Sequence, residues 1–158
     1  MGQLTFQTTI RLAEPRDLEA VAALAVKMRD ETHWKDVQFT PNPEAAAIWM
    51  LAVLSMSPDY MLYVAEDYGK IVGFCLGILT AHPFVASVPI VAELGWYVLP
   101  EYRQTGIGWR LWEEVVAWGN QLGAKAASYH KPFATKQDRY GFHAIEVVYW
   151  RDLEAIHG

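Results

Sequence analysis

The chain has 158 residues and a formal net charge of −5, with 13 lysines and arginines against 18 aspartates and glutamates. This acidic balance argues against nucleic-acid binding, which needs a basic face, and it mildly favours a cationic or amine ligand. The length suits one domain over residues 1–158. No membrane association is expected, because no apolar run reaches the roughly 18 residues that a membrane span needs.

Cysteine content indicates the compartment. Cys75 is the single cysteine, so no internal disulfide can form, and this fits a reducing environment. The first residues also lack the charged and then apolar pattern of a secretion signal, so we expect a cytoplasmic protein. Cys75 lies in the apolar run "IVGFCLGIL" and is predicted to be a buried structural thiol. No His, Cys, Asp or Glu spacing suggests a metal site.

The first half of the chain predicts a strand, two helices and a pair of strands. Residues 8–13 alternate in polarity and form the first strand. Pro15 opens a helix that runs to about residue 29, and Asn42 with Pro43 caps a second helix that ends near Ser57-Pro58. Two β-rich runs joined by the glycine-containing stretch "DYGK" then predict a hairpin of residues 60–66 and 70–80.

The second half predicts a strand, a long helix and then shorter elements. Residues 90–99 form the strand, and the helix that follows ends at Gly123, a natural residue for that position. A weaker strand, a short helix and a last strand follow at residues 125–130, 134–139 and 144–150. This order of elements predicts a mixed sheet with helices on both faces, in the α/β (α+β) class.

The stretch "PEYRQTGIGWRL" lies between the strand over 90–99 and the long helix. The first amide groups of a helix have no partners inside it and carry a partial positive charge, so they can bind a phosphate group. Gly106 and Gly108 allow the ligand to approach the backbone, and Arg103 and Gln104 can add side-chain contacts. A tight turn that binds nothing would have the same sequence features.

The same region resembles a known family motif. "VLPEYRQTGIGWRL" is similar to the acetyl-CoA motif Q/R-x-x-G-x-G/A of the GNAT-type N-acetyltransferases, with Arg103, Gly106 and Gly108 at its three positions. "IRLAEPRDLEAVAAL", "YVAEDYGKIVGFCLG" and "HKPFATKQDRYGF" resemble other parts of the family, so the resemblance spans nearly the whole chain. It implies a GNAT fold, with a mixed central sheet of six to seven strands flanked by about four helices. A dinucleotide site is disfavoured, because G-x-G-x-x-G is absent.

The resemblance implies acetyl-CoA as the cofactor. The pantetheine arm would hydrogen-bond along the splayed strand at Tyr97, Val98 and Leu99. A backbone N–H near Tyr97 or Val98 would polarise the acetyl carbonyl. The diphosphate would lie on the backbone amides of Gln104, Thr105, Gly106, Ile107 and Gly108.

Amine acetylation needs a base for the amine and an acid for the leaving thiolate. Glu93 is the only acid on the strand where family members carry a glutamate base, but it needs a bulge to face the same way as Val98. Otherwise it is a satisfied polar group near a strand end. Gln137 occupies the position of the tyrosine that serves as the acid in the family, so His130, Tyr140 and Tyr129 are the candidate replacements. For Tyr140 a place in the core is the alternative, and departure of the thiolate without an enzymic acid is a further one.

The acceptor site is expected to be formed by two segments, residues 30–42 and the loop of residues 81–89. Glu31, His33, Trp34 and His82 supply an acid, two imidazoles and an aromatic ring, which suits a small-molecule or peptide amine. The alternative is that Trp34 covers the core and that the histidines are solvated.

Two further expectations concern partners and activity. Trp109 and Trp112 lie off or beside the apolar stripe of the long helix, which suggests a cover for the cofactor's adenine or a homodimer contact. The resemblance implies acetyl transfer from acetyl-CoA to a primary amine by direct attack. The alternative is a catalytically inactive acyl-CoA-binding module of the same fold that acts in regulation or interaction.

Overall fold

The computed structural model describes residues 7–32, 42–132 and 146–153. Over these residues, six strands form one mixed sheet in their chain order, and only the β4–β5 pair is parallel. The strands are β1 (Thr8–Leu12), β2 (Tyr60–Asp67), β3 (Lys70–Ala81), β4 (Pro89–Val98), β5 (Ala126–Pro132) and β6 (Glu146–Asp152). The predicted mixed sheet is therefore confirmed.

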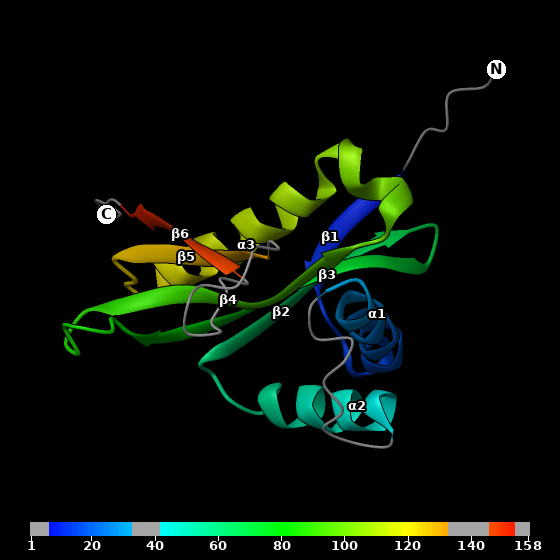
Figure 1. Cartoon of the computed structure of the whole chain (residues 1–158), viewed down its shortest axis with the longest axis horizontal. Coiled ribbons are helices and arrows are strands. Elements are labelled where there is room, and N and C mark those ends of the chain that lie inside the picture. The colour runs from blue at the N-terminus through cyan, green and yellow to red at the C-terminus, as the bar shows by residue number, and fades with distance from the viewer. Residues whose placement is uncertain (1–6, 33–41, 133–145, 154–158) are drawn as a thin grey trace, which may run out of the picture.

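Helices cover both faces of this sheet. Figure 1 shows α1 and α2 on one side and α3 on the other, as the sequence predicted. The α-helices are α1 (Leu18–Asp30), α2 (Pro43–Leu54) and α3 (Ile107–Gln121), and the 3-10 turns are η1 (Pro15–Asp17) and η3 (Pro100–Thr105). No helix in the part of the chain that the structure describes is long and apolar enough to cross a membrane. The short helix expected at 134–139 lies outside the described residues.

Local signals in the sequence explain where these elements begin and end. The Asn42 side chain accepts a hydrogen bond from the Ala45 N–H at 3.0 Å and caps α2, as predicted. Tyr68 and Gly69 have φ angles of 48° and 82°, the positive values that a two-residue hairpin turn requires. Pro15 differs from expectation because it opens the 3-10 turn η1, after which α1 begins at Leu18.

Helix α3 packs tightly against the middle of the sheet. A Cβ atom at Gly77 of β3 would lie 2.3 Å from a methyl carbon of Val115, so only glycine allows this approach. Trp112 is 2% exposed, and its ring stacks with Trp96 of β4. Trp112 was expected off or beside the apolar stripe and available to the adenine or to a second copy, and its burial against Trp96 shows that this expectation is wrong. Trp109 remains 50% exposed.

An ion-pair cluster joins β1, η1 and β2. Arg11 donates to the Asp17 carboxylate at 2.7 and 3.0 Å and to Glu66 at 2.8 Å. Asp17 is buried, and it also accepts the Glu14 N–H at 2.7 Å, which begins the first helical turn. The hydrogen bonds from Arg11 are the main reason that the pKa of Asp17 is lowered.

Substituting Asp17→Asn should reduce the free energy of unfolding by about 1–3 kcal/mol at neutral pH, because it removes buried charge-assisted hydrogen bonds. The folded-state pKa of Asp17 lies below its unfolded value, so this stabilisation is present above about pH 4 and disappears as the pH falls further. Urea unfolding of both proteins at neutral and acidic pH measures the difference. The exposed substitution Glu19→Gln is the control, and an Asp17→Asn effect that does not shrink at low pH would contradict the account.

Candidate active site

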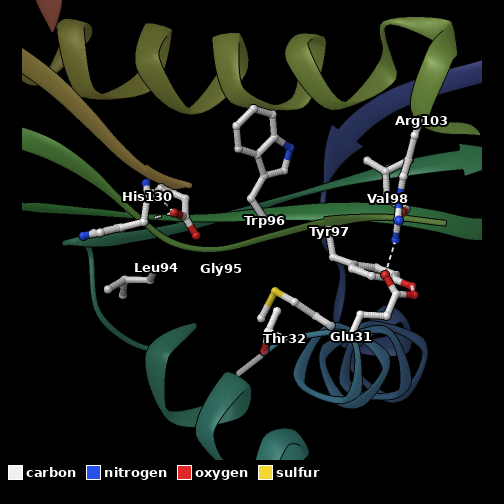
Figure 2. Close-up of a pocket in the computed structure, with 11 residues that line it drawn as sticks. Glu31, Thr32, Leu94, Gly95, Trp96, Tyr97, Val98, Arg103 and His130 are labelled. Atoms are coloured by element: carbon white, nitrogen blue, oxygen red, sulfur yellow. Dashed lines mark hydrogen bonds and ion pairs between the residues drawn. The ribbon is translucent and has the colours of Figure 1, made fainter. Parts of the chain in front are cut away.

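A cavity opens where strands β4 and β5 separate. These parallel strands pair only through Val91 with Ala127 and Ala92 with Ser128. Beyond the last pair, the rings of Trp96 and Tyr129 meet edge to face with centroids 5.6 Å apart. The cavity has a volume of about 620 Å³. Figure 2 shows it, and its lining residues are Met28, Glu31, Thr32, Glu93, Leu94, Gly95, Trp96, Tyr97, Val98, Arg103 and His130.

A β-bulge in β4 sets the direction of Glu93. Leu76 of β3 pairs with Gly95 and Gly77 pairs with Glu93, so Leu94 is the extra residue. The partners of Glu93 and Val98 on β3 are Gly77 and Gly73, which are four residues apart and so lie on one face. The bulge that the sequence required is therefore present, and Glu93 faces the same way as Val98.

Glu93 and His130 form a polar pair at one end of the cavity. Glu93 Oε2 accepts the His130 backbone N–H at 3.2 Å and lies 3.6 Å from the ring atom Nδ1. The Glu93 side chain is 9% exposed and that of His130 is 38% exposed. A buried carboxylate beside a partly exposed imidazole can take up a proton and pass it towards solvent.

Cys75 lies in the core and takes no part in this pair. It is fully buried, and burial, with a smaller effect from the charge of Glu93, raises the pKa of its thiol well above the usual value. The thiol therefore stays protonated, which agrees with the predicted structural role.

Glu31, Tyr97 and Arg103 form a second polar group at the other end of the cavity (Figure 2). The Tyr97 hydroxyl donates to Glu31 Oε1 at 2.6 Å, and Arg103 Nη2 donates to Glu31 Oε2 at 2.5 Å. The hydrogen bond from Tyr97, followed by the one from Arg103, lowers the pKa of Glu31. Burial and then Glu31 raise the pKa of Tyr97 to about 12. Glu31 is thus an anion at neutral pH, and Tyr97 keeps its proton.

The glycine turn exposes backbone amides at the start of α3. Gly106 is the N-cap residue with φ of +80°, and a Cβ atom there would meet nothing within 4 Å. The Arg110 N–H donates to the Gly106 carbonyl at 3.1 Å, so the amides before it have no acceptor four residues earlier within the helix. This turn can accept a diphosphate group.

The side chains of the glycine turn differ in how far they can contact a bound ligand. The Thr105 hydroxyl donates to the Tyr102 carbonyl at 2.6 Å, and the Ile107 side chain is buried. Ile107 therefore has only its backbone amide to offer a ligand. The Thr105 N–H lies at the end of η3, where the 3-10 pattern pairs it with the Tyr102 carbonyl, so a ligand must share or displace that bond. Gln104 is exposed and can add its side chain, whereas the Arg103 guanidinium is already bonded to Glu31.

The backbone of β4 has one open edge beside the cavity. The Leu99 N–H donates to the Val72 carbonyl at 2.9 Å, inside the sheet. Because backbone groups alternate between the two edges of a strand, those of Tyr97 face β3 and those of Val98 face the opening. Of the two amides expected to polarise an acetyl carbonyl, the geometry favours Val98. Leu99 cannot offer its N–H to a pantetheine arm.

The structure gathers some of the predicted site residues and not others. His82 follows β3, accepts the Phe84 N–H at 3.1 Å, and packs its ring against Trp150 of β6. It is not among the described residues that line the cavity, so its place in the acceptor site stays a prediction. His33, Trp34 and Tyr140 lie outside the described residues.

Five of the described lining residues were not predicted as site residues. They are Met28 on the first helix, Thr32 in the segment 30–42 expected to bind the acceptor, and Leu94, Gly95 and Trp96 on β4. The bulge at Leu94 could have indicated Trp96, because it places Trp96 on the same face as Glu93.

Comparisons with known proteins agree with this geometry. A sequence model described as "Acetyltransferase (GNAT) family" matches residues 27–143. No curated protein sequence matches the chain.

Several solved structures share the fold. An aminoglycoside N-acetyltransferase in complex with coenzyme A is 21% identical, with a TM-score of 0.65 over 82% of this chain and 80% of the other. A transcriptional regulator from Bacillus halodurans is 18% identical, with a TM-score of 0.64 over 85% of each chain. An acetyltransferase from Vibrio fischeri is 24% identical, with a TM-score of 0.61 over 77% of this chain and 93% of the other.

Proposed function

Because the chain belongs to the acetyltransferase (GNAT) family, which uses acetyl-CoA as its acyl donor, we propose that it transfers an acetyl group to a primary amine. The observation that supports this most strongly is the separation of β4 from β5, which opens a cavity between Arg103, just before the glycine turn, and the Glu93–His130 pair. The cofactor supplies an activated thioester. The chain supplies the binding site for this thioester and the side chains that transfer protons.

In this proposal, backbone amides hold the cofactor. The amides between Gln104 and Gly108 bind the diphosphate, because helix-start amides carry partial positive charge and Gly106 leaves the approach open. The open edge of β4 at Val98 binds the pantetheine arm, and the Val98 N–H polarises the acetyl carbonyl. The Tyr97 ring forms one wall of the cavity.

Glu93 acts as the base in this scheme. It removes a proton from the ammonium form of the amine, directly or through one water, and later releases this proton to solvent. The neutral nitrogen then bonds to the acetyl carbon and loses its second proton to water. As the carbon–sulfur bond breaks, His130 supplies a proton to the sulfur and regains one from solvent. Tyr140 is the alternative donor.

The acceptor is a cationic amine in this proposal. Glu31 presents an anionic carboxylate to the cavity, and Tyr97, Met28 and Trp96 add aromatic and apolar surface. His33 and Trp34 remain candidates from the adjoining segment.

We also propose a cytoplasmic location, supported by the lone and buried Cys75. A homodimer remains a prediction. Strand β6 lies at the edge of the sheet and exposes Val148, Tyr149 and Trp150, and this surface supports it.

Release of free thiol from acetyl-CoA tests the proposal. We expect thiol release that depends on the amine for at least one member of a panel of an aminoglycoside, a polyamine, an amino acid and a peptide with a free N-terminus. The second candidate is a non-catalytic acyl-CoA-binding module, and the likeness in fold to a transcriptional regulator favours it. Coenzyme A binding without turnover of any amine would support this second candidate.

A further inference from the structure

The side chain of Arg103 reaches across the open edge of β4 to the end of α1 (Figure 2). Its Nε atom donates to the Val98 carbonyl at 2.8 Å, and its Nη2 atom donates to Glu31 at 2.5 Å. The guanidinium also lies 5.2 Å from the centre of the Tyr97 ring. One side chain therefore joins the backbone edge proposed for the cofactor to the carboxylate proposed for the acceptor.

Arg103 occupies two groups that the proposed ligands would bind, the Val98 carbonyl and the Glu31 carboxylate. The Val98 carbonyl is the acceptor that the open edge offers to an amide N–H of a pantetheine arm. Each Glu31 oxygen already accepts a hydrogen bond, one from Tyr97 and one from Arg103. An arriving ammonium group must therefore share or replace the Arg103 contact.

The Glu31–Arg103 pair can change partners at low cost. Each side chain is 43% exposed, and exposed ion pairs contribute little to stability because water screens them. Glu31 also lies at the C-cap of α1, where the partial negative charge of the helix disfavours a carboxylate. Among the described residues that line the cavity, the second acid is Glu93, which is only 9% exposed, so an ammonium group meets Glu31 before Glu93.

We infer that Glu31 and Arg103 form a latch that couples the two binding sites. The ammonium group of the acceptor replaces Arg103 on Glu31, and the released guanidinium uncovers the Val98 carbonyl and is free to reach the diphosphate. Each ligand then increases the affinity for the other, because such coupling is reciprocal. This inference rests on the proposed function, and it makes Glu31 a positioning residue as well as a contact for the acceptor.

Calorimetric titration with coenzyme A alone tests the latch. Glu31→Gln keeps an acceptor for the Tyr97 hydroxyl and removes the ion pair, so coenzyme A should bind about 1.5- to 5-fold more tightly than to the unsubstituted protein, the range expected for an exposed pair. Glu101→Gln is the matched control. It changes the charge equally on the exposed surface of η3, closer in sequence to the glycine turn, and should leave the affinity unchanged.

A double-mutant cycle separates the latch from general electrostatics. In the Arg103→Ala background, Glu31→Gln should no longer change coenzyme A affinity. The inference is wrong if Glu31→Gln leaves coenzyme A affinity unchanged or lowers it. It is also wrong if Glu101→Gln raises the affinity equally, or if Glu31→Gln still raises it in the Arg103→Ala background. Failure of the unsubstituted protein to bind coenzyme A would overturn the proposed function together with the latch.

Discussion

Substituting Gly106→Glu should weaken coenzyme A binding about 10- to 150-fold, which corresponds to the loss of one charge-assisted hydrogen bond. Gly106 is the N-cap of α3, with a φ angle of +80° and open space where a Cβ atom would lie. A carboxylate there repels the diphosphate and covers the amides that the proposal assigns to it. Calorimetry on the folded variant measures the loss.

Gly69→Glu provides a matched control for backbone strain. Gly69 has a φ angle of +82° and equally open surroundings, but it lies in the β2–β3 turn. Both variants should lose similar stability, because a side chain is strained at either φ angle. Only the substitution at Gly106 should reduce coenzyme A affinity. Equal affinity for both variants would show that the glycine turn does not hold the diphosphate.

Glu93→Gln should lower kcat by about 10²- to 10⁴-fold, the range expected when a general base is removed. Glutamine keeps a side-chain oxygen that can accept the His130 N–H, so β4 and β5 should keep their relative positions. Coenzyme A affinity should change little, because the bulge at Leu94 separates Glu93 from the part of β4 that is proposed to bind the cofactor. Steady-state kinetics with an active amine, together with coenzyme A titration, measures both quantities.

Asp67→Asn is the control for the loss of a buried strand carboxylate. Asp67 lies on β2, is 8% exposed, and accepts the Tyr102 hydroxyl at 2.9 Å, away from the cavity lining. Its kcat should remain close to the unsubstituted value even if its stability falls. Unchanged kcat in Glu93→Gln would remove Glu93 as the base and leave it as a structural contact for His130.

The elements that follow from short-range rules were predictable from sequence. Asn42-Pro43 as a helix start, "DYGK" as a hairpin turn and Gly123 after the end of α3 each depend on neighbouring residues alone. The family motif placed the glycine turn between β4 and α3 in the same way. The sequence predicted that Glu93 would face the same way as Val98 only if β4 contained a bulge. It could not predict the bulge itself, because a bulge depends on how β4 pairs with β3.

Contacts between distant segments were not predictable. The Glu31–Arg103 pair joins residues 72 positions apart, and no pattern in either segment indicates it. Trp112 is buried because Trp96 and Tyr129 lie opposite it, and helical periodicity carries no information about those partners. His82 was expected beside the acceptor because of its loop, and its contact with Trp150 of β6 could not be read from that loop.

A crystal structure with coenzyme A bound tests the central claim most directly. We expect diphosphate oxygens at hydrogen-bonding distance from amides between Gln104 and Gly108, and the pantetheine arm along the open edge of β4 with Arg103 displaced from the Val98 carbonyl. A nucleotide bound at another surface, with β4 still covered by Arg103, would contradict the account.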